Sequence, residues 1–212
     1  MYGRRQVAVL ACISAAVVIS ACNRPAEAPG TNAVPGATAP AGGAAPLSGE
    51  AQIERGRMLV IGGGCHDCHT PKKFTDKGPE FDYDRALSGH PQDAKIDAPF
   101  KQDPKSPWTT HTNDHLTAWS GAWGVSFAAN ITGDSNTGIG IWTEKMFIDA
   151  MRTGKHMGTS RQILPPMPWN FYGQLPDEDL KALLAYLKST KPIANRVPVP
   201  LGPDGKPIEE PQ

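Results

Sequence analysis

Hydrophobic residues recur at spacings of three and four in several segments of this chain, and such spacing predicts helices. One predicted helix covers residues 48–61 and ends at Gly62-Gly63-Gly64, because three consecutive glycines are a strong helix breaker. Another covers residues 144–153. There Thr143 is a candidate N-cap and Gly154 a candidate C-cap. Both helices are therefore bounded by residues that suit helix ends.

The clearest helical pattern covers residues 176–190. Acidic side chains occupy its first turn, where the helix dipole favours them, and its apolar stripe consists of Leu180, Leu183, Leu184 and Leu187. Between Thr70 and Gly140 the pattern is poor, with prolines, glycines and only short apolar runs such as Trp123 to Phe127. Such a length without clear elements is typical of loops over a cofactor or of a functional insertion. The pattern as a whole predicts a mainly α domain with long irregular loops.

The first 21 residues have the pattern of a secretory signal peptide. Arg4 and Arg5 precede an apolar run from Val7 to Ile19, which is too short to span a bilayer. The run ends at Ile19-Ser20-Ala21-Cys22, which resembles a bacterial lipobox. We therefore expect an exported protein on the periplasmic side of a membrane, anchored by lipid at Cys22. An aspartate directly after the lipidated cysteine often retains a lipoprotein at the inner membrane. This chain has Asn23 there instead, which favours the outer membrane.

Composition divides the rest of the chain into three parts. Residues 22–47 are almost entirely Ala, Pro, Gly and small polar residues, which predicts a disordered tether. Residues 48–195 are expected to form one domain, and residues 196–212 a Pro-rich C-terminal tail. The 212 residues carry 21 basic and 21 acidic side chains, with no basic run. No nucleic-acid partner is therefore expected.

The most specific motif is Cys65-His66-Asp67-Cys68-His69. Two cysteines three positions apart with a histidine directly after them are typical of covalent c-type haem attachment. The thiols of Cys65 and Cys68 would bind the two vinyl groups, and His69 would be an axial ligand of the iron. The motif occurs once, which predicts a single haem c.

Two other uses of the cysteine pair were considered. A structural zinc site normally needs a second pair of ligands, and the chain has no second cysteine pair. A thioredoxin-like dithiol would lie in a βαβ pattern, which this Gly- and Pro-rich sequence lacks. His111 and His115 have a spacing that could bind a metal on a helix, but in so polar a stretch they are expected at the solvated surface.

The second axial ligand is the choice that separates an electron carrier from a ligand-binding haem protein. Met167 is the preferred candidate, because prolines on both sides make Ile163-Leu164-Pro165-Pro166-Met167-Pro168-Trp169 a stiff strap. His156 is the second choice. The other candidates after the motif are Met146, Met151, Met157, His90, His111 and His115. Met146 and Met151 lie in a predicted helix, where methionine is more often a core residue.

Together these features resemble the class I cytochrome c fold: a helix before the Cys-x-x-Cys-His motif, a late Pro-flanked methionine and a Leu-rich last helix. Short motifs are also similar to those of bacterial monohaem c-type cytochromes, including haem domains of cytochrome c subunits of membrane-bound dehydrogenases. They are Asn130-Ile131-Thr132, Thr137-Gly138-Ile139-Gly140-Ile141-Trp142, Arg152-Thr153-Gly154 and Pro165-Pro166-Met167-Pro168-Trp169.

The resemblance implies roles for individual residues. Cys65 and Cys68 would hold the haem, with His69 and Met167 as axial ligands. Gly78-Pro79 resembles the Gly-Pro whose carbonyl receives the proximal imidazole N–H in that fold. Gly56 and Tyr186 would mark the crossing of the first and last helices. An insertion around residues 85–119 has no counterpart in the minimal fold.

The sequence thus favours a membrane-anchored electron-transfer protein that is not itself an enzyme, although it could be a subunit of an oxidoreductase complex. Its partners would be an exported dehydrogenase and another cytochrome or a terminal oxidase. Two alternatives remain. One is a haem-based ligand-binding or redox-enzyme subunit with an open or exchangeable sixth iron position. The other is a lipoprotein without haem, in which the cysteine pair is incidental.

Overall fold

The computed structural model describes residues 47–208, except 97, 102 and 104. The predicted signal peptide, the lipidation site at Cys22 and the tether up to residue 46 lie outside these residues. Within the described part, none of the helices combines the length and the hydrophobicity needed to cross a bilayer.

All three helices predicted from the hydrophobic pattern are present. They are α1 (Gly49–Gly62), α3 (Glu144–Thr153) and α5 (Asp177–Ser189). The predicted caps of α3 are also confirmed. The Thr143 hydroxyl accepts a hydrogen bond from the Met146 amide at 3.2 Å, and Gly154 adopts a left-handed φ of 68°.

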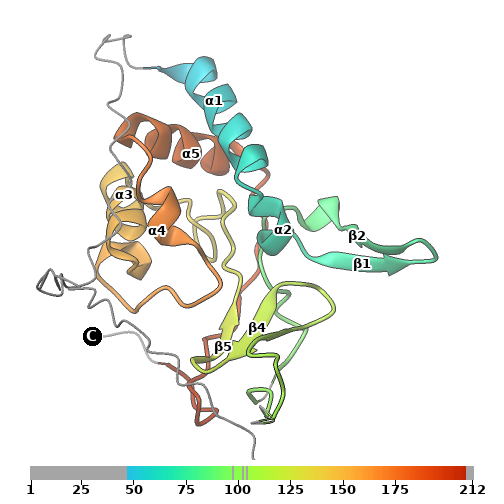
Figure 1. Ribbon diagram of the computed structural model, residues 1–212. Helices are drawn as coiled ribbons and strands as arrows, with labels where there is room; N and C mark the ends of the chain where they lie inside the picture. The colour runs from blue at the N-terminus through green and yellow to red at the C-terminus, as the bar shows by residue number, and fades with distance from the viewer. Residues whose placement is uncertain (1–46, 97, 102, 104, 209–212) are drawn as a thin grey trace, which may run out of the picture. The chain divides into compact units, whose positions relative to one another are not determined.

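Helices α1 and α5 cross in close contact, as Figure 1 shows. A Cβ atom at Gly56 would overlap the Ala182 carbonyl and lie 2.7 Å from Tyr186 Cβ. The crossing predicted for Gly56 and Tyr186 is therefore confirmed. The apolar stripe of α5 faces α1 and α3 and forms the centre of the main core, whose buried members include Val60, Ala150, Leu180, Leu183, Leu184 and Leu187.

Two short helices lie at the Cys-x-x-Cys-His motif and next to the Pro-rich strap. The first, α2 (Cys65–His69), contains the whole Cys-x-x-Cys-His motif and follows α1 after two glycines. The second, α4 (Trp169–Tyr172), follows the Pro-rich strap. The 3₁₀ turns η1 (Tyr83–Arg85) and η2 (His156–Gly158) complete the helical elements of the described chain.

The region between α2 and α3 contains strands, which the sequence pattern did not predict. Strands β1 (Lys72–Thr75) and β2 (Gly78–Phe81) form a hairpin that projects from the end of α2 (Figure 1). Strands β3 (His111–Thr112), β4 (Ala118–Gly121) and β5 (Gly124–Phe127) form an antiparallel sheet. Each strand has at most four residues, so alternation within it is too short to be read from the sequence.

The chain after α5 returns to this three-stranded sheet. The Val125 and Leu201 backbones exchange hydrogen bonds of 2.8 and 2.9 Å, and Arg196 N donates to Gln92 Oε1 at 3.1 Å. The Pro-rich stretch from residue 196 to Ile208 therefore contacts both β5 and the segment around Gln92.

Candidate haem site

Helix α2 places Cys65 against the main core. It begins after Gly64, whose φ of 67° is left-handed, a conformation that glycine adopts without strain. Cys65 and Cys68 are partly buried free thiols. Burial raises the pKa of Cys65 to about 11, and it also raises the pKa of Cys68. Both side chains are therefore neutral thiols near neutral pH.

His69 ends α2 and is only 9% exposed. Its Nδ1 lies 2.7 Å from the Ala129 carbonyl oxygen, and because a carbonyl can only accept, Nδ1 carries the proton. In the part of the chain that the structure describes, the other ring nitrogen, Nε2, has no hydrogen bond. Burial lowers the pKa of His69, which favours the neutral imidazole. His69 therefore presents a fixed tautomer with a free Nε2 lone pair, the form that binds a metal.

Pro79 does not have the role predicted for it. It lies exposed in β2, where it pairs with Phe74, and the acceptor of the His69 N–H is Ala129. The hairpin turns Pro79 away because β1 and β2 pair with each other directly after α2. The prediction for Pro79 is thus wrong in its residue, although a backbone carbonyl does receive the imidazole proton.

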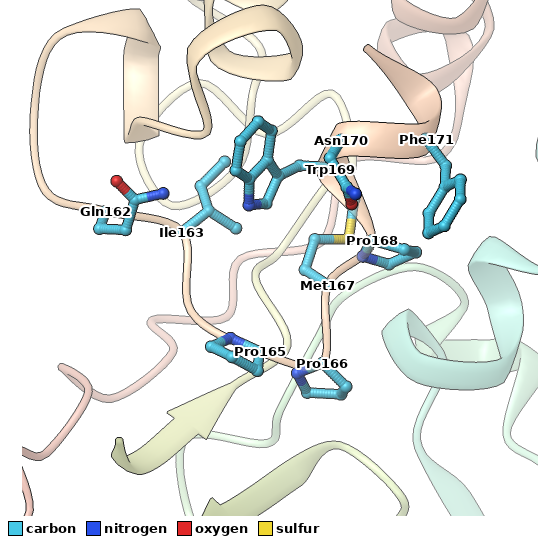
Figure 2. A pocket seen from close by; sticks show the side chains of 9 residues that line it. All are labelled: Gln162, Ile163, Pro165, Pro166, Met167, Pro168, Trp169, Asn170 and Phe171. Carbon is cyan, nitrogen blue, oxygen red and sulfur yellow. The ribbon is translucent and has the colours of Figure 1, made fainter. Parts of the chain in front are cut away.

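Met167 lies in an apolar wall formed by the strap. A cavity of about 460 Å³ is lined by Gln162, Ile163, Pro165, Pro166, Met167, Pro168, Trp169, Asn170 and Phe171 (Figure 2). Met167 is partly buried and packs against the same core cluster as Cys65. The strap thus provides a thioether and an apolar surface next to the core that also holds the motif.

One short segment contacts both the motif and the strap. Ser126, in β5, donates its hydroxyl hydrogen to the Pro165 carbonyl at 2.5 Å, and Ala129, just after β5, accepts from His69. Ser126 and Ala129 are three residues apart, which spans at most about 11 Å of extended chain. The strap and His69 are therefore anchored to neighbouring points of one segment.

The other methionine and histidine candidates occupy different surroundings. Met151 is 8% exposed in the core, and Met146 and Met157 pack against that core. His156 lies in η2, with its ring 5.2 Å from that of Trp142. His90 is fully buried and bonded through both ring nitrogens, to Thr117 Oγ1 at 2.9 Å and the Ala94 carbonyl at 2.5 Å.

His111 and His115 are not paired as a metal site. The His111 ring stacks on Phe100, whereas His115 Nδ1 lies 2.7 Å from the Lys72 carbonyl. Over the described residues, no group of three or more His, Cys, Asp and Glu side chains is arranged to hold a metal ion.

These residues fit a c-type haem by the chemistry of their donors. Two neutral thiols and an imidazole with a fixed tautomer and a free Nε2 lie within one turn-and-a-half of helix, and an apolar cavity with a thioether lies in the strap. An apolar wall suits the porphyrin face, and a buried neutral imidazole suits the iron. The sequence motif and the local geometry agree on the same cofactor.

Comparison with known proteins points to the same chemistry. The chain is 29% identical over 151 residues to a nicotinate dehydrogenase subunit of Pseudomonas putida. It is 38% identical over 77 residues to the fructose dehydrogenase cytochrome subunit of Gluconobacter japonicus. It is also 28% identical over 145 residues to the gluconate 2-dehydrogenase cytochrome c subunit of Pantoea cypripedii. The chain is therefore similar to cytochrome c subunits of dehydrogenases. The resemblance read from its motifs is confirmed.

The extent of these matches is limited. They cover 70%, 36% and 68% of this chain but only 9%, 16% and 24% of the three relatives, respectively. This chain thus spans less than a quarter of the length of each. No protein-family model matches it.

Three contacts around the site were not predicted: the Ala129 carbonyl, the Ser126 hydroxyl and the Tyr172 hydroxyl, which donates to the Gly63 carbonyl at 2.5 Å. Ala129 directly precedes the Asn130-Ile131-Thr132 motif, which was the one local signal for it. Nothing near Ser126 or Tyr172 in the sequence distinguishes them from ordinary polar residues.

Proposed function

We propose that this chain is an exported, membrane-anchored cytochrome that carries single electrons between redox proteins through one covalently bound haem c. Cys65 and Cys68 would hold the haem through thioether bonds, and His69 and Met167 would be the ligands of its iron. The observation that carries this proposal is the His69 imidazole, whose Nδ1 proton is held by Ala129 so that Nε2 is free for the iron. The haem iron supplies the chemistry by alternating between the ferric and ferrous states.

The residues of the chain have three tasks in this function. The Ala129 carbonyl orients the His69 ring and increases its basicity toward the iron. The Met167 thioether favours the ferrous state, which gives a high reduction potential. The apolar residues of the strap would exclude water from the haem beside Met167. A low water content would also favour the less charged ferrous iron.

The partners are redox proteins: a dehydrogenase on one side and another cytochrome or a terminal oxidase on the other. This is supported by the homologues, which are named as subunits of nicotinate, fructose and gluconate dehydrogenases. The chain acts as an electron carrier in such a system and does not itself convert the substrate. Lipid at Cys22 would hold it on the periplasmic side of a bacterial membrane, with the outer membrane favoured.

Replacement of Met167 by alanine tests the ligand assignment. The ferric parent should show the weak far-red absorbance band of methionine ligation, and Met167→Ala should lose it. The ferrous variant should then bind carbon monoxide, because its sixth position is open. Met58→Ala is the matched control, since Met58 is 53% exposed on α1, and it should keep the band.

Four results would contradict parts of the proposal. A Met167→Ala protein that keeps the band has another methionine as the axial ligand, whereas one that loses the band and still does not bind carbon monoxide has a different ligand, with His156 the next candidate. A parent protein that lacks the band and binds carbon monoxide unmodified would support the alternative, a haem protein with an open sixth position. A purified protein without haem absorbance would exclude both.

A further inference from the structure

The strap that contains Met167 can form few backbone hydrogen bonds of its own. Three of the five residues from Leu164 to Pro168 are prolines, which have no N–H to donate. Pro165, Pro166 and Pro168 are exposed, and the stretch contains neither helix nor strand. A thioether is a weak ligand for ferric iron, so its retention depends on how firmly the protein backbone is held.

Before Met167, the strap is held by the three-stranded sheet. Ser126 is buried in β5, and its hydroxyl donates to the Pro165 carbonyl at 2.5 Å. The Trp123 indole N–H donates to the same hydroxyl at 3.2 Å, which satisfies its acceptor side and orients its proton toward Pro165. Because β5 leads directly to the His69 acceptor Ala129, this contact joins the strap to the element that orients the proximal histidine.

After Met167, the strap is held by Tyr172 at the end of α4. Its hydroxyl donates to the Gly63 carbonyl at 2.5 Å, across 109 positions of sequence. Gly63 lies two residues before Cys65, and a Cβ atom there would come within 3.2 Å of the Tyr172 hydroxyl and 3.1 Å of its ring. The absence of a side chain at Gly63 therefore permits this contact. The bond joins the chain just beyond Met167 to the turn just before the haem motif.

We propose that Ser126 and Tyr172 are positioning residues that clamp the strap from its two ends and so keep Met167 on the iron. The proposal rests on Met167 being the axial ligand. It gives β5, which follows the insertion around residues 85–119, a role in supporting the strap. Neither side chain needs to touch the iron, because each acts on the backbone that carries Met167.

Imidazole binding to the ferric haem-loaded protein measures the clamp, because imidazole binds only when Met167 leaves the iron. Ser126→Ala and Tyr172→Phe each remove one hydroxyl. Each should raise the affinity for imidazole by about two- to tenfold, the effect of one net hydrogen bond. The far-red band should persist in both without imidazole. The double variant should show the product of the two effects if the ends of the strap act independently.

Matched controls remove a hydroxyl elsewhere. Tyr186→Phe and Ser135→Ala are suitable, because neither side-chain hydroxyl forms a hydrogen bond among the residues that the structure describes, and both should bind imidazole as the parent does. Ser126→Ala could misfold because Trp123 loses its hydrogen-bond partner. In that case Tyr172→Phe, which keeps the aromatic ring, still tests whether the strap is held on the side after Met167.

The outcomes separate the clamp from the ligand assignment. If Met167→Ala binds imidazole more tightly while Tyr172→Phe and Ser126→Ala bind it as the parent does, the clamp is refuted and Met167 remains the ligand. If Met167→Ala leaves both the band and the imidazole affinity unchanged, the ligand assignment is refuted, and the clamp with it. Tighter imidazole binding in Met167→Ala and in both clamp variants, with unchanged controls, supports the proposal.

Discussion

Lys72 is a charged residue in a nearly buried position, with 6% of its surface exposed. Its Nζ donates to the Asp67 and Thr70 carbonyls at 2.9 and 3.0 Å, and it lies 4.0 Å from the centre of the Phe81 ring. Burial lowers the pKa of Lys72. The last carbonyls of a helix have no partner within the helix, so the ammonium group completes the hydrogen bonding of α2. Lys72 thus stabilises the segment that carries His69.

Replacing Lys72 with methionine should therefore destabilise the haem-loaded protein by about 1–3 kcal/mol, since carbonyls of α2 lose their donor inside the fold. Denaturant unfolding of the ferric protein, followed by haem absorbance, measures the change. The neighbouring Lys73→Met is the control, because Lys73 is exposed in β1. Equal midpoints for the two variants would show that the Lys72 bonds contribute nothing to stability.

Among the elements, α1 and α5 were predicted from their periodicity, and their crossing depends on one glycine. At Gly56 the backbones of the two helices come too close for any side chain. The short strands, in contrast, were not predicted from the sequence pattern. The run Trp123 to Phe127 was visible as apolar, but it became β5 only because β4 pairs with it over four positions. Helices satisfy their backbone groups locally, whereas a strand needs a partner from elsewhere in the chain.

Gly56→Ala tests the crossing. The added methyl would overlap the Ala182 carbonyl, so the helices must separate, and the free energy of unfolding should fall by about 1–3 kcal/mol. In Gly62→Ala the same methyl meets nothing within 4 Å, which makes it the matched control on the same helix. Thermal unfolding of both variants compares them. A Gly56→Ala protein as stable as Gly62→Ala would mean that the crossing can widen without cost.

Long-range contacts join the inserted region to the end of the chain. Asn195 is 8% exposed, and its Nδ2 donates to the Ser88 and His90 carbonyls at 2.7 and 2.9 Å, while its Oδ1 accepts from Gln92 N at 3.0 Å. These partners lie more than 100 positions away in the sequence. The chain after α5 is therefore held against the insertion by the hydrogen bonds of Asn195.

Asn195→Ala should leave two carbonyls and an amide without this partner. A buried polar group left without a hydrogen-bond partner lowers the free energy of unfolding by about 1–3 kcal/mol, and we expect Asn195→Ala to lower it by an amount at the upper end of that range. The measurement is denaturant unfolding, with protease digestion to show where the protein opens. Asn136→Ala, at an exposed position, is the control. If cleavage and stability match the control, the C-terminal stretch does not hold the insertion.

The sequence by itself determined the features that depend on neighbouring residues. These are the Cys-x-x-Cys-His motif, the caps of α3, the apolar stripe of α5 and the resemblance to cytochromes. Only the tertiary structure decided what surrounds the motif. The His69 acceptor is Ala129 at a separation of 60 positions, and Pro165 and Gly63 receive hydrogen bonds from residues 39 and 109 positions away. All three acceptors are main-chain carbonyls of residues without a polar side chain: alanine, proline and glycine. Every residue has a carbonyl, so residue type carries no signal for these contacts, and only the folded path of the chain selects them.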